Sequence, residues 1–488
     1  MEDTLTLRPD IVGNPFKRAW SFGFNTCHAP IVMRTDVQEH MREAGQLFGM
    51  RYWRCHGTLS DDVGIVLPGR DGEPDHYAFS GLKRILDAGL AAGVKPFFEL
   101  SFMPKALARD PKPTITWYRG HTSPPGDWDR WSRLIDHLVA WLLATYGRSE
   151  IDTWYFEVWN EPNIGFWAGT QEEYFELYAR AARALKAACP TLRVGGPATA
   201  RAAWVADLLD YCKDNDVPCD FISTHIYPND VAFVEGAEGE TKRLGMDFMV
   251  GEIRRVHREV TERRPGLPVF WGEWNSSAGP LVPNHDTCGN AAAAVAGCSA
   301  IEAYADGSLW WNLSDVYEEP NYHFAPFHGG YGLFTVDNLI KSAGRGFELL
   351  HGLPSHQAAV EGLPDTWERG ALFGIDPVTG HGRLILWHCD PPEADNPTAP
   401  ESWQCTVRGL PGNQPCTLTA ILPEAGSACE TWERLGAPTT LTPDQEAQLR
   451  GASLPHRERP RSPGERLTLE IPPGTVWAID FSPSRKQI

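Results

Sequence analysis

Two glutamates follow apolar, strand-like runs of the sequence and could act together as a catalytic pair. Glu161 closes the run TWYFEVWNE (153–161), and Glu273 lies in PVFWGEWNSS (268–277). A protonated carboxyl group can give its proton to a departing oxygen, and an ionised carboxylate can attack the anomeric carbon of a sugar. The pair therefore predicts glycoside hydrolysis, with Glu161 as the acid and later the base, and Glu273 as the nucleophile. A separation of about 5–5.5 Å would retain the anomeric configuration, and about 6.5–9.5 Å would invert it.

The neighbours of Glu161 suit the same reaction. Asn160 can hydrogen-bond the hydroxyl next to the anomeric carbon, while Trp159 and Trp167 can exclude water and raise the pKa of the acid. Asn-Glu-Pro also has a structural reading, because Pro162 could open a helix whose dipole favours the carboxylate. The presence of Glu273 favours the catalytic reading.

Glu157 is a rival carboxylate in the same run. It has the same parity as Glu161 and would lie deeper inside a barrel, where a carboxylate needs a partner. Arg51 or Arg54 could supply that partner. We therefore interpret Glu157 as structural.

The two glutamates would meet if their strands closed into a barrel. Amphipathic helical patterns, such as 129–147 and 172–189, separate several of the strand-like runs. Eight runs predict a (β/α)₈ TIM barrel over residues 15–345, with all strand ends on one face. A doubly wound open sheet is the alternative, but no glycine-rich phosphate turn follows the first run. The runs are 20–26, 50–57, 94–100, 153–160, 192–197, 219–225, 268–274 and 307–313.

The pattern changes after the barrel. Short alternating runs punctuated by proline and glycine predict an accessory C-terminal β-sandwich over residues 346–488. One helix is expected at 442–453, begun by Thr442 and Pro443. The N-terminal segment 1–14 could add a strand to the sandwich.

Composition narrows the class of partner. The formal net charge of −19 disfavours nucleic acids, anionic membranes and acidic glycans, and leaves a small neutral oligosaccharide as the expected substrate. The N-terminus has no apolar signal segment and the 11 cysteines show no paired spacing, so we expect a cytoplasmic protein. No cofactor is indicated. No metal is indicated either, since His56 and His225 lack a third ligand at a recognisable spacing.

Six stretches of the chain carry distinctive motifs. Five of them are RCHGTLSDD (54–62), WYRGHTSPPGDWDRW (117–131), FEVWNEPN (156–163), THIYP (224–228) and GEWNSS (272–277). The sixth is the long stretch between Trp310 and His351, with Tyr-Glu-Glu-Pro and Phe-His-Gly-Gly inside it, and it is the most specific. Together these stretches resemble glycoside hydrolase family 39, which contains β-xylosidases and α-L-iduronidases.

The resemblance implies the same roles for Glu161 and Glu273 and adds a set of sugar-binding residues. His225 and Tyr227 share one strand face and can point at the nucleophile, and Glu318 and Glu319 can accept hydrogen bonds from two hydroxyls of a neutral pentose. One departure is Ala278, where an aromatic residue is expected in β-xylosidases. The implied sugar-binding residues are His56, Asn160, His225, Tyr227, Trp311, Glu318 and Glu319.

The leading hypothesis is a retaining exo-β-xylosidase that releases xylose from β-1,4-linked xylo-oligosaccharides. The same mechanism could act on an α-L-iduronide, an α-L-arabinoside or a β-glucoside, although an iduronide would need cations for its carboxylate. A non-catalytic carbohydrate-binding barrel is the third hypothesis, but it would be expected to have lost one of the two glutamates. The sequence leaves the oligomeric state open and is compatible with a homo-oligomer.

Overall fold

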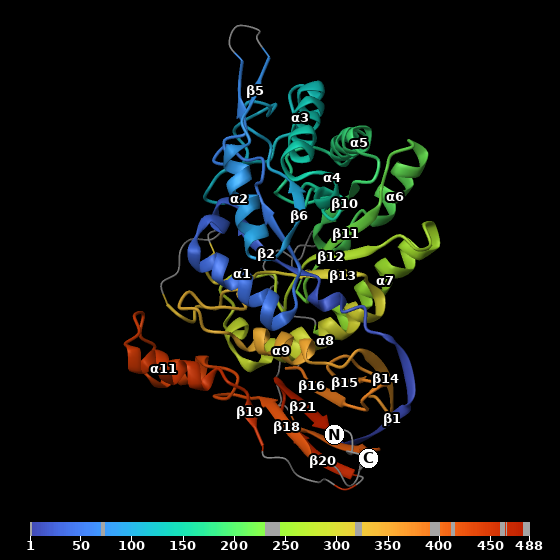
Figure 1. The fold of residues 1–488 in the computed structure, drawn as a ribbon, viewed down its shortest axis with the longest axis vertical. Coiled ribbons are helices and arrows are strands. Elements are labelled where there is room, and N and C mark those ends of the chain that lie inside the picture. Colours follow the sequence, from blue (N-terminus) through green and yellow to red (C-terminus); the bar gives the residue numbers. More distant parts are fainter. Residues whose placement is uncertain are drawn as a thin grey trace.

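The computed structural model describes residues 2–69, 74–229, 245–317, 325–390, 401–410, 415–458, 464 and 466–481. Its larger part is a closed barrel of parallel strands in which each strand pairs with its neighbours in chain order (Figure 1). The predicted eight-stranded barrel is confirmed. The barrel strands are β2 (Gly23–His28), β3 (Tyr52–His56), β6 (Lys95–Leu100), β9 (Tyr155–Val158), β10 (Arg193–Thr199), β11 (Phe221–Ile226), β12 (Val269–Trp274) and β13 (Gly307–Trp310).

Helices surround the barrel, and each predicted helical pattern forms one. The patterns at 129–147 and 172–189 form α3 and α5, whose apolar sides are buried. The helices are α1 (Thr35–Phe48), α2 (Ser80–Ala91), α3 (Trp128–Tyr146), α4 (Arg148–Ile151), α5 (Gln171–Ala188), α6 (Val205–Asp214), α7 (Met246–Arg263), α8 (Cys288–Tyr304) and α9 (Ser342–His351). Short 3-10 turns lie at Ala19–Ser21, Ala29–Met33, Ala200–Ala202 and Pro283–Asp286.

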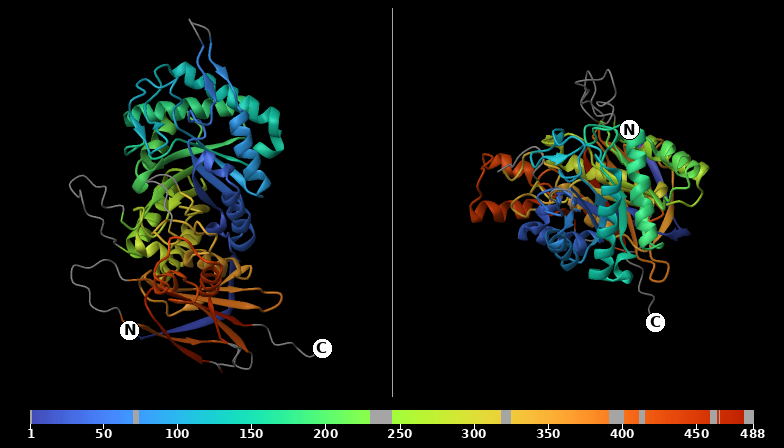
Figure 2. Two further views of the ribbon diagram at one scale, coloured as in Figure 1. Left: turned by 90° about the vertical axis from the view of Figure 1, so that its left-hand side faces the viewer. Right: turned by 90° about the horizontal axis from the view of Figure 1, so that it is seen from above.

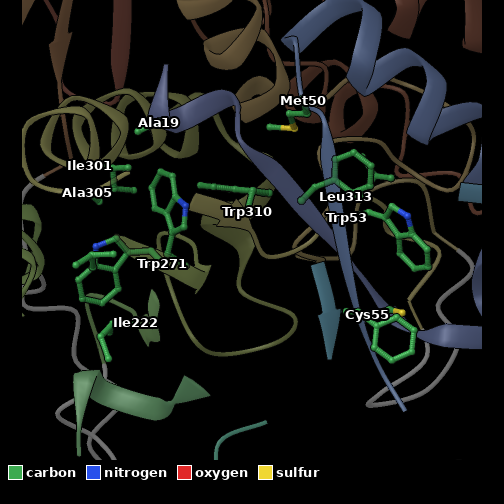
Figure 3. Close-up of a cluster of buried hydrophobic side chains, with 14 of the residues drawn as sticks. Ala19, Met50, Trp53, Cys55, Ile222, Trp271, Ile301, Ala305, Trp310 and Leu313 are labelled. Atoms are coloured by element: carbon green, nitrogen blue, oxygen red, sulfur yellow. The ribbon is translucent and has the colours of Figure 1, made fainter. Parts of the chain in front are cut away.

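The space between strands and helices is filled by large apolar side chains. Trp271 of β12 lies beside Ile222 of β11 and faces Ile301 and Ala305 at the end of α8 (Figure 3). Helix α8 is alanine-rich and buried on nearly every face, because the barrel covers one side and the second domain the other.

We call the end of the barrel where its strands begin the lower end, and the end where its strands finish the upper end. The lower end of the interior is closed by a layer of aromatic rings, which we call the aromatic floor. It consists of Phe22, Phe97, Tyr155, Phe221 and Phe270, and neighbouring ring centroids lie 4.8–6.1 Å apart. Most contacts are edge-to-face or tilted, which is the favourable geometry for aromatic pairs. The floor leaves only the upper end of the barrel for polar side chains.

The second domain is a mixed nine-stranded sheet that packs against α8 and α9 on the outside of the barrel, and it lies below the barrel in the views of Figure 1 and Figure 2 (left). Leu5, Leu384, Leu418 and Leu469 come from strands far apart in the sheet order and share one core. The sheet therefore folds over itself as the predicted β-sandwich. In sheet order its strands are β19 (His456–Arg457), β18 (Cys416–Ile421), β21 (Thr475–Phe481), β16 (Gly382–His388), β15 (Arg369–Ile375), β14 (His356–Glu361), β1 (Glu2–Pro15), β17 (Trp403–Arg408) and β20 (Arg466–Ile471).

Two further helices, α10 (Cys429–Arg434) and α11 (Pro443–Ala452), project from the side of this domain (Figure 1). The expected start of α11 is confirmed: the Thr442 side chain accepts from the Gln445 backbone N–H, and Pro443 occupies the first turn. Two small hairpins, β4 (Val66–Leu67) with β5 (His76–Tyr77) and β7 (Thr114–Ile115) with β8 (Gly120–His121), complete the described strands.

All 11 cysteines are buried, and each carries a thiol and not a disulfide bond. None of the helices in the described part of the chain combines the length and apolarity that a bilayer crossing demands.

Candidate active site

The chain after β9 turns sharply and presents Asn160 and Glu161 at the upper end of the barrel. Trp159 and Glu161 both have positive φ angles, of 73° and 43°, which side-chain-bearing residues rarely adopt. The indole N–H of Trp159 donates to the Phe166 carbonyl, and the Glu161 N–H donates to the Ala198 carbonyl. These contacts hold the turn.

The reading of Asn-Glu-Pro as a helix start is wrong. Residues 162–166 form a turn, and α5 begins only at Gln171, where Thr170 and Glu173 make a reciprocal capping box. The carboxylate of Glu161 is therefore held by the barrel end and not by a helix dipole.

A bulge in β12 turns Glu273 into the barrel. Thr224 and His225 of β11 are consecutive, but they pair with Trp271 and Glu273, so β12 contains one extra residue at Gly272. A side chain at Gly272 would crowd His225 Nε2 and Glu157 Oε1 at 3.1 and 3.3 Å. The glycine allows the bulge, and the bulge places Glu273 beside His225.

Arg54 of β3 lies fully buried at the centre of the upper barrel and uses all five of its N–H donors. Its five partners come from β2, β6 and β12 and from β9 with the turn that follows it. The ion pair with Glu157 confirms one of the two arginines considered for that carboxylate. We call Arg54 and these partners the charged layer. The contacts are Glu157 (Nε, 2.5 Å), Glu273 (Nη1, 2.7 Å), Asn25 (Nη1, 3.2 Å), Glu99 (Nη2, 2.6 Å) and Asn160 (Nη2, 2.8 Å).

Glu161 and Glu273 face each other across His225. The Nδ1 atom of His225 lies 2.9 Å from Glu161 Oε1 and 3.5 Å from Glu273 Oε2. One carboxylate oxygen of Glu161 lies within 4.8 Å of one of Glu273. The two glutamates predicted as a pair are thus brought together.

The two carboxyl groups sit in different electrostatic surroundings. Burial raises the pKa of Glu161 to about 7; Arg54 opposes this effect and Glu99 adds to it. Burial also raises the pKa of Glu273, but His225, Arg54 and His56 all oppose that rise. Burial lowers the pKa of His225 to about 4, so its imidazole is neutral near pH 7. The site can therefore hold Glu161 protonated near neutral pH while several donors stabilise an ionised Glu273.

Other predicted sugar-binding residues surround Glu273. His56 Nε2 lies 3.5 Å from Glu273 Oε1, and its Nδ1 lies 2.8 Å from Glu99. The phenol of Tyr227 donates to Glu273 Oε2 at 3.3 Å. The ring of Trp311 packs 5.0 Å from that of His56. Glu318 and Glu319 lie outside the described residues.

An aromatic cluster stands where the sequence departs from the family pattern. Ala278 packs against Tyr227, Trp311 and Tyr331, and its carbonyl accepts a hydrogen bond from the Tyr331 phenol at 2.6 Å. The rings of Trp311 and Tyr331, from the loop after β13, thus pack against Ala278.

A buried ion network that sequence analysis missed fastens this last loop. Lys341 donates to Asp286, to Asp315 (2.9 Å) and to the Gly330 carbonyl (2.7 Å), and all three charged side chains are buried. Asp286 accepts from the Gly329 N–H at 2.5 Å. Gly329 has φ of +78°, and a side chain there would collide with the backbone of Leu281 and Val282, which explains the Gly-Gly pair.

Glu161, His225 and Glu273 could also hold a metal ion, since each offers one ligand atom within 4.8 Å of the others. Two carboxylates and an imidazole suit a borderline cation such as Zn²⁺. The same atoms form the carboxylate pair, so a bound cation and a sugar would compete for them.

Comparisons with known proteins agree with this geometry. The family model "Glycosyl hydrolases family 39" matches residues 4–467. A β-xylosidase of Caldicellulosiruptor saccharolyticus is 35% identical over 90% of this chain and 89% of its own length. The crystal structure of a monomeric β-xylosidase from Caulobacter crescentus CB15 superposes with a TM-score of 0.86 at 29% identity, covering 99% of both chains. Human α-L-iduronidase is 30% identical over 55% of this chain and 40% of its own length.

Proposed function

The chain belongs to glycosyl hydrolases family 39 and is a glycoside hydrolase, and from this premise we propose that it is a retaining exo-β-xylosidase acting on short β-1,4-linked xylo-oligosaccharides. The observation that carries the retaining mechanism is the approach of Glu161 and Glu273 to within 4.8 Å between carboxylate oxygens. That separation suits direct attack by one carboxylate. It is shorter than the about 6.5–9.5 Å at which an inverting enzyme places a water between its two carboxyl groups.

In the first step, the protonated Glu161 gives its proton to the glycosidic oxygen as Glu273 attacks the anomeric carbon. The bond to the leaving saccharide breaks, and a covalent glycosyl–Glu273 ester forms. In the second step, the ionised Glu161 takes a proton from water, whose oxygen displaces Glu273 and releases the sugar with its configuration retained. The pKa of Glu161 near 7 suits both halves of this cycle.

Arg54 keeps the nucleophile ionised and in position. Its Nη1 donates to Glu273 Oε1, and Tyr227 donates to Oε2, so both carboxylate oxygens are oriented. Asn160 accepts from Arg54 through Oδ1, which leaves its buried Nδ2 without a partner in the described part of the chain. That amide can donate to the sugar hydroxyl next to the anomeric carbon.

The charges of the site favour a neutral sugar in the glycone position. All five N–H donors of Arg54 are committed to protein groups, and the ammonium of Lys341 is held by two aspartates and a carbonyl. Among the described residues, neither buried cation at this end of the barrel can therefore take the carboxylate of an iduronide. The identity to curated β-xylosidases supports xylose.

A panel of aryl glycosides tests the proposal. We expect the wild-type enzyme to hydrolyse the β-xyloside faster than the α-L-arabinoside, β-glucoside and α-L-iduronide, and to release β-xylose as the first anomer seen by NMR. Glu273→Ala should abolish this turnover, whereas Glu262→Ala, an exposed carboxylate on α7, should retain it. Preference for another sugar would contradict the substrate assignment. Release of α-xylose, or turnover that survives in Glu273→Ala, would contradict the mechanism.

A further inference from the structure

A basic hollow lies beside the β7–β8 hairpin, in the loop that follows barrel strand β6. Its volume is about 580 Å³. The hollow is lined by Lys105, Pro111, Lys112, Thr114, Arg119 and His121.

Three cationic side chains of this hollow have no carboxylate partner within the described residues. Two acids border the hollow but contact other groups of its lining: Asp61 accepts from the Lys105 backbone N–H and pairs with His121 at 3.3 Å, and Asp110 accepts from the Lys112 backbone N–H. The ammonium groups of Lys105 and Lys112 and the guanidinium of Arg119 remain available. Other arginines of the same region are paired, Arg109 with Glu173 and Arg130 with Asp75. In a chain of net charge −19, this local excess of cations indicates an anion site.

Two chains of contacts connect the hairpin to the catalytic pair. The ring of Tyr118 stacks on His28 at 3.7 Å, and His28 is the register partner of His56 in the barrel. Gly120 packs flat against Phe102, whose ring lies 6.1 Å from that of His56. His56 in turn lies 3.5 Å from Glu273. The hairpin therefore borders the upper end of the barrel, and two side chains, Phe102 and His56, lie between it and Glu273.

An aromatic surface accompanies the cations. Trp117, at the tip of the same hairpin, has 51% of its surface exposed, although tryptophan is usually among the more buried residues. An exposed indole face suits contact with the apolar face of a pyranose ring. A ring surface next to unpaired cations is suited to a sugar that carries a negative charge.

We propose that the basic hollow is a leaving-group subsite that binds the carboxylate of a uronic acid unit attached to a xylo-oligosaccharide. The inference rests on the proposed function, since it places the neutral terminal xylose against Glu273 and the acidic unit on the leaving side. Arg119 can bind a carboxylate through two parallel N–H donors, and the lysines add point charges. The expectation from net charge that acidic glycans are disfavoured does not extend to this hollow, because screening limits the influence of distant charges to about 8 Å at physiological salt.

The experiment compares an acidic substrate with a neutral one of the same shape. The substrate is xylotriose bearing a glucuronic acid branch on the second or the third xylose from the cleaved end, and the control substrate is its methyl ester. The readout is the ratio of kcat/KM for the acid to kcat/KM for the ester, at low and at high salt. For at least one branch position we expect a ratio of about 10 in the wild type, which falls towards 1 in 0.5 M NaCl.

The double variant Lys112→Gln/Arg119→Gln should lower this ratio to about 1, while Lys83→Gln, an exposed lysine of α2 paired with Asp87, should keep the wild-type ratio. Thermal unfolding of each variant shows whether it is folded. A wild-type ratio of 1 or below for both branch positions overturns the inference, as does a ratio that the double variant leaves unchanged. Failure to release xylose from unbranched xylotriose would instead refute the proposed function.

Discussion

The barrel interior contains two layers built by the same strands and of opposite character. Strand β6 gives Phe97 to the aromatic floor and Glu99, two residues later, to the charged layer. Strand β9 likewise gives Tyr155 to the floor and Glu157 to the layer above. Because side chains alternate along a strand, a step of two residues keeps the same face and moves about 6–7 Å along the barrel. Within that step the interior changes from aromatic rings to carboxyl and guanidinium groups.

The two layers contribute to different properties of the enzyme. Burying large rings in edge-to-face contact stabilises the fold, whereas burying charges costs free energy that their mutual ion pairs only partly return. We propose that the charged layer instead fixes the ionisation and position of Glu273. On this account the aromatic floor serves stability and the charged layer serves chemistry, although removing one partner from the charged layer would leave buried charges unpaired.

Arg54→Met should have the largest effect, because it lowers both the stability of the fold and the catalytic rate. It leaves Glu99, Glu157 and Glu273 buried without their common cation. We expect a loss of about 3–5 kcal/mol in the free energy of unfolding and a fall in kcat/KM of at least about 10³-fold. Urea unfolding and aryl xyloside kinetics measure the two effects. Arg51→Met, on an exposed side chain of the same segment, is the control; an Arg54 variant that behaves like it would contradict the role of the charged layer.

Glu161→Gln should affect chemistry with little cost in folding. We expect kcat/KM for a xyloside with a poor leaving group to fall about 10²–10⁴-fold, because no acid remains to protonate the departing oxygen. The wild-type pH profile should decline as pH rises through about 7, where Glu161 loses its proton, and this decline should be missing from the variant. An unchanged alkaline decline in the variant would show that another group is the acid.

Phe97→Ala tests the aromatic floor. The Phe97 side chain is almost fully buried and contacts Phe22, Tyr155, Phe221 and Phe270. We expect the free energy of unfolding to fall by about 3–5 kcal/mol while kcat at 25 °C stays within a few-fold of wild type. A loss of kcat as large as that of Arg54→Met, in protein shown to be folded, would mean that the two layers do not divide stability from chemistry.

The smallest effect concerns stability as a function of pH. The folded-state pKa of Glu161 is raised from 4.5 to about 7, so the folded state binds more protons than the unfolded state between these values. Stability from this group is therefore present below pH 4.5 and is lost as pH rises through 7. As pH rises from 5 to 8, the free energy of unfolding of Glu161→Gln should increase relative to that of the wild type by on the order of 1–3 kcal/mol. Thermal unfolding of both proteins at the two pH values checks this. If the stability difference between variant and wild type were the same at pH 5 and pH 8, the raised pKa of Glu161 would be contradicted.

Much of the fold could be predicted because its signals are local. Eight apolar runs, several of them separated by helical patterns, predicted the barrel, and the Thr442–Pro443 pair predicted the start of α11. Strands β14 and β15 carry weaker local signals, because residues 356–375 show weaker alternation interrupted by glycine. The capping box of α5 at Thr170 and Glu173, which sequence analysis overlooked, would have argued against a helix start at Pro162.

The parts of the site that depend on contacts distant in sequence could not be predicted in the same way. Glu161 and Glu273 were found from residue type and position after a strand. The convergence of Arg54 on groups from four other strands requires the closed barrel, and the inward turn of Glu273 requires a bulge at Gly272. The Lys341 network joins the loop after β13 to the loop after β12, and periodicity describes neither of them.

Trapping of the covalent intermediate tests the central claim most directly. The fluorine of a 2-deoxy-2-fluoro-β-xyloside slows both the formation and the hydrolysis of the glycosyl-enzyme. A good leaving group keeps the formation step fast enough, so the glycosyl-enzyme should accumulate. Peptide mapping by mass spectrometry should then find one fluoroxylosyl group on Glu273. An adduct on Glu99, Glu157 or Glu161, or normal turnover of xylosides with no adduct at all, would contradict the assignment of Glu273 as the nucleophile.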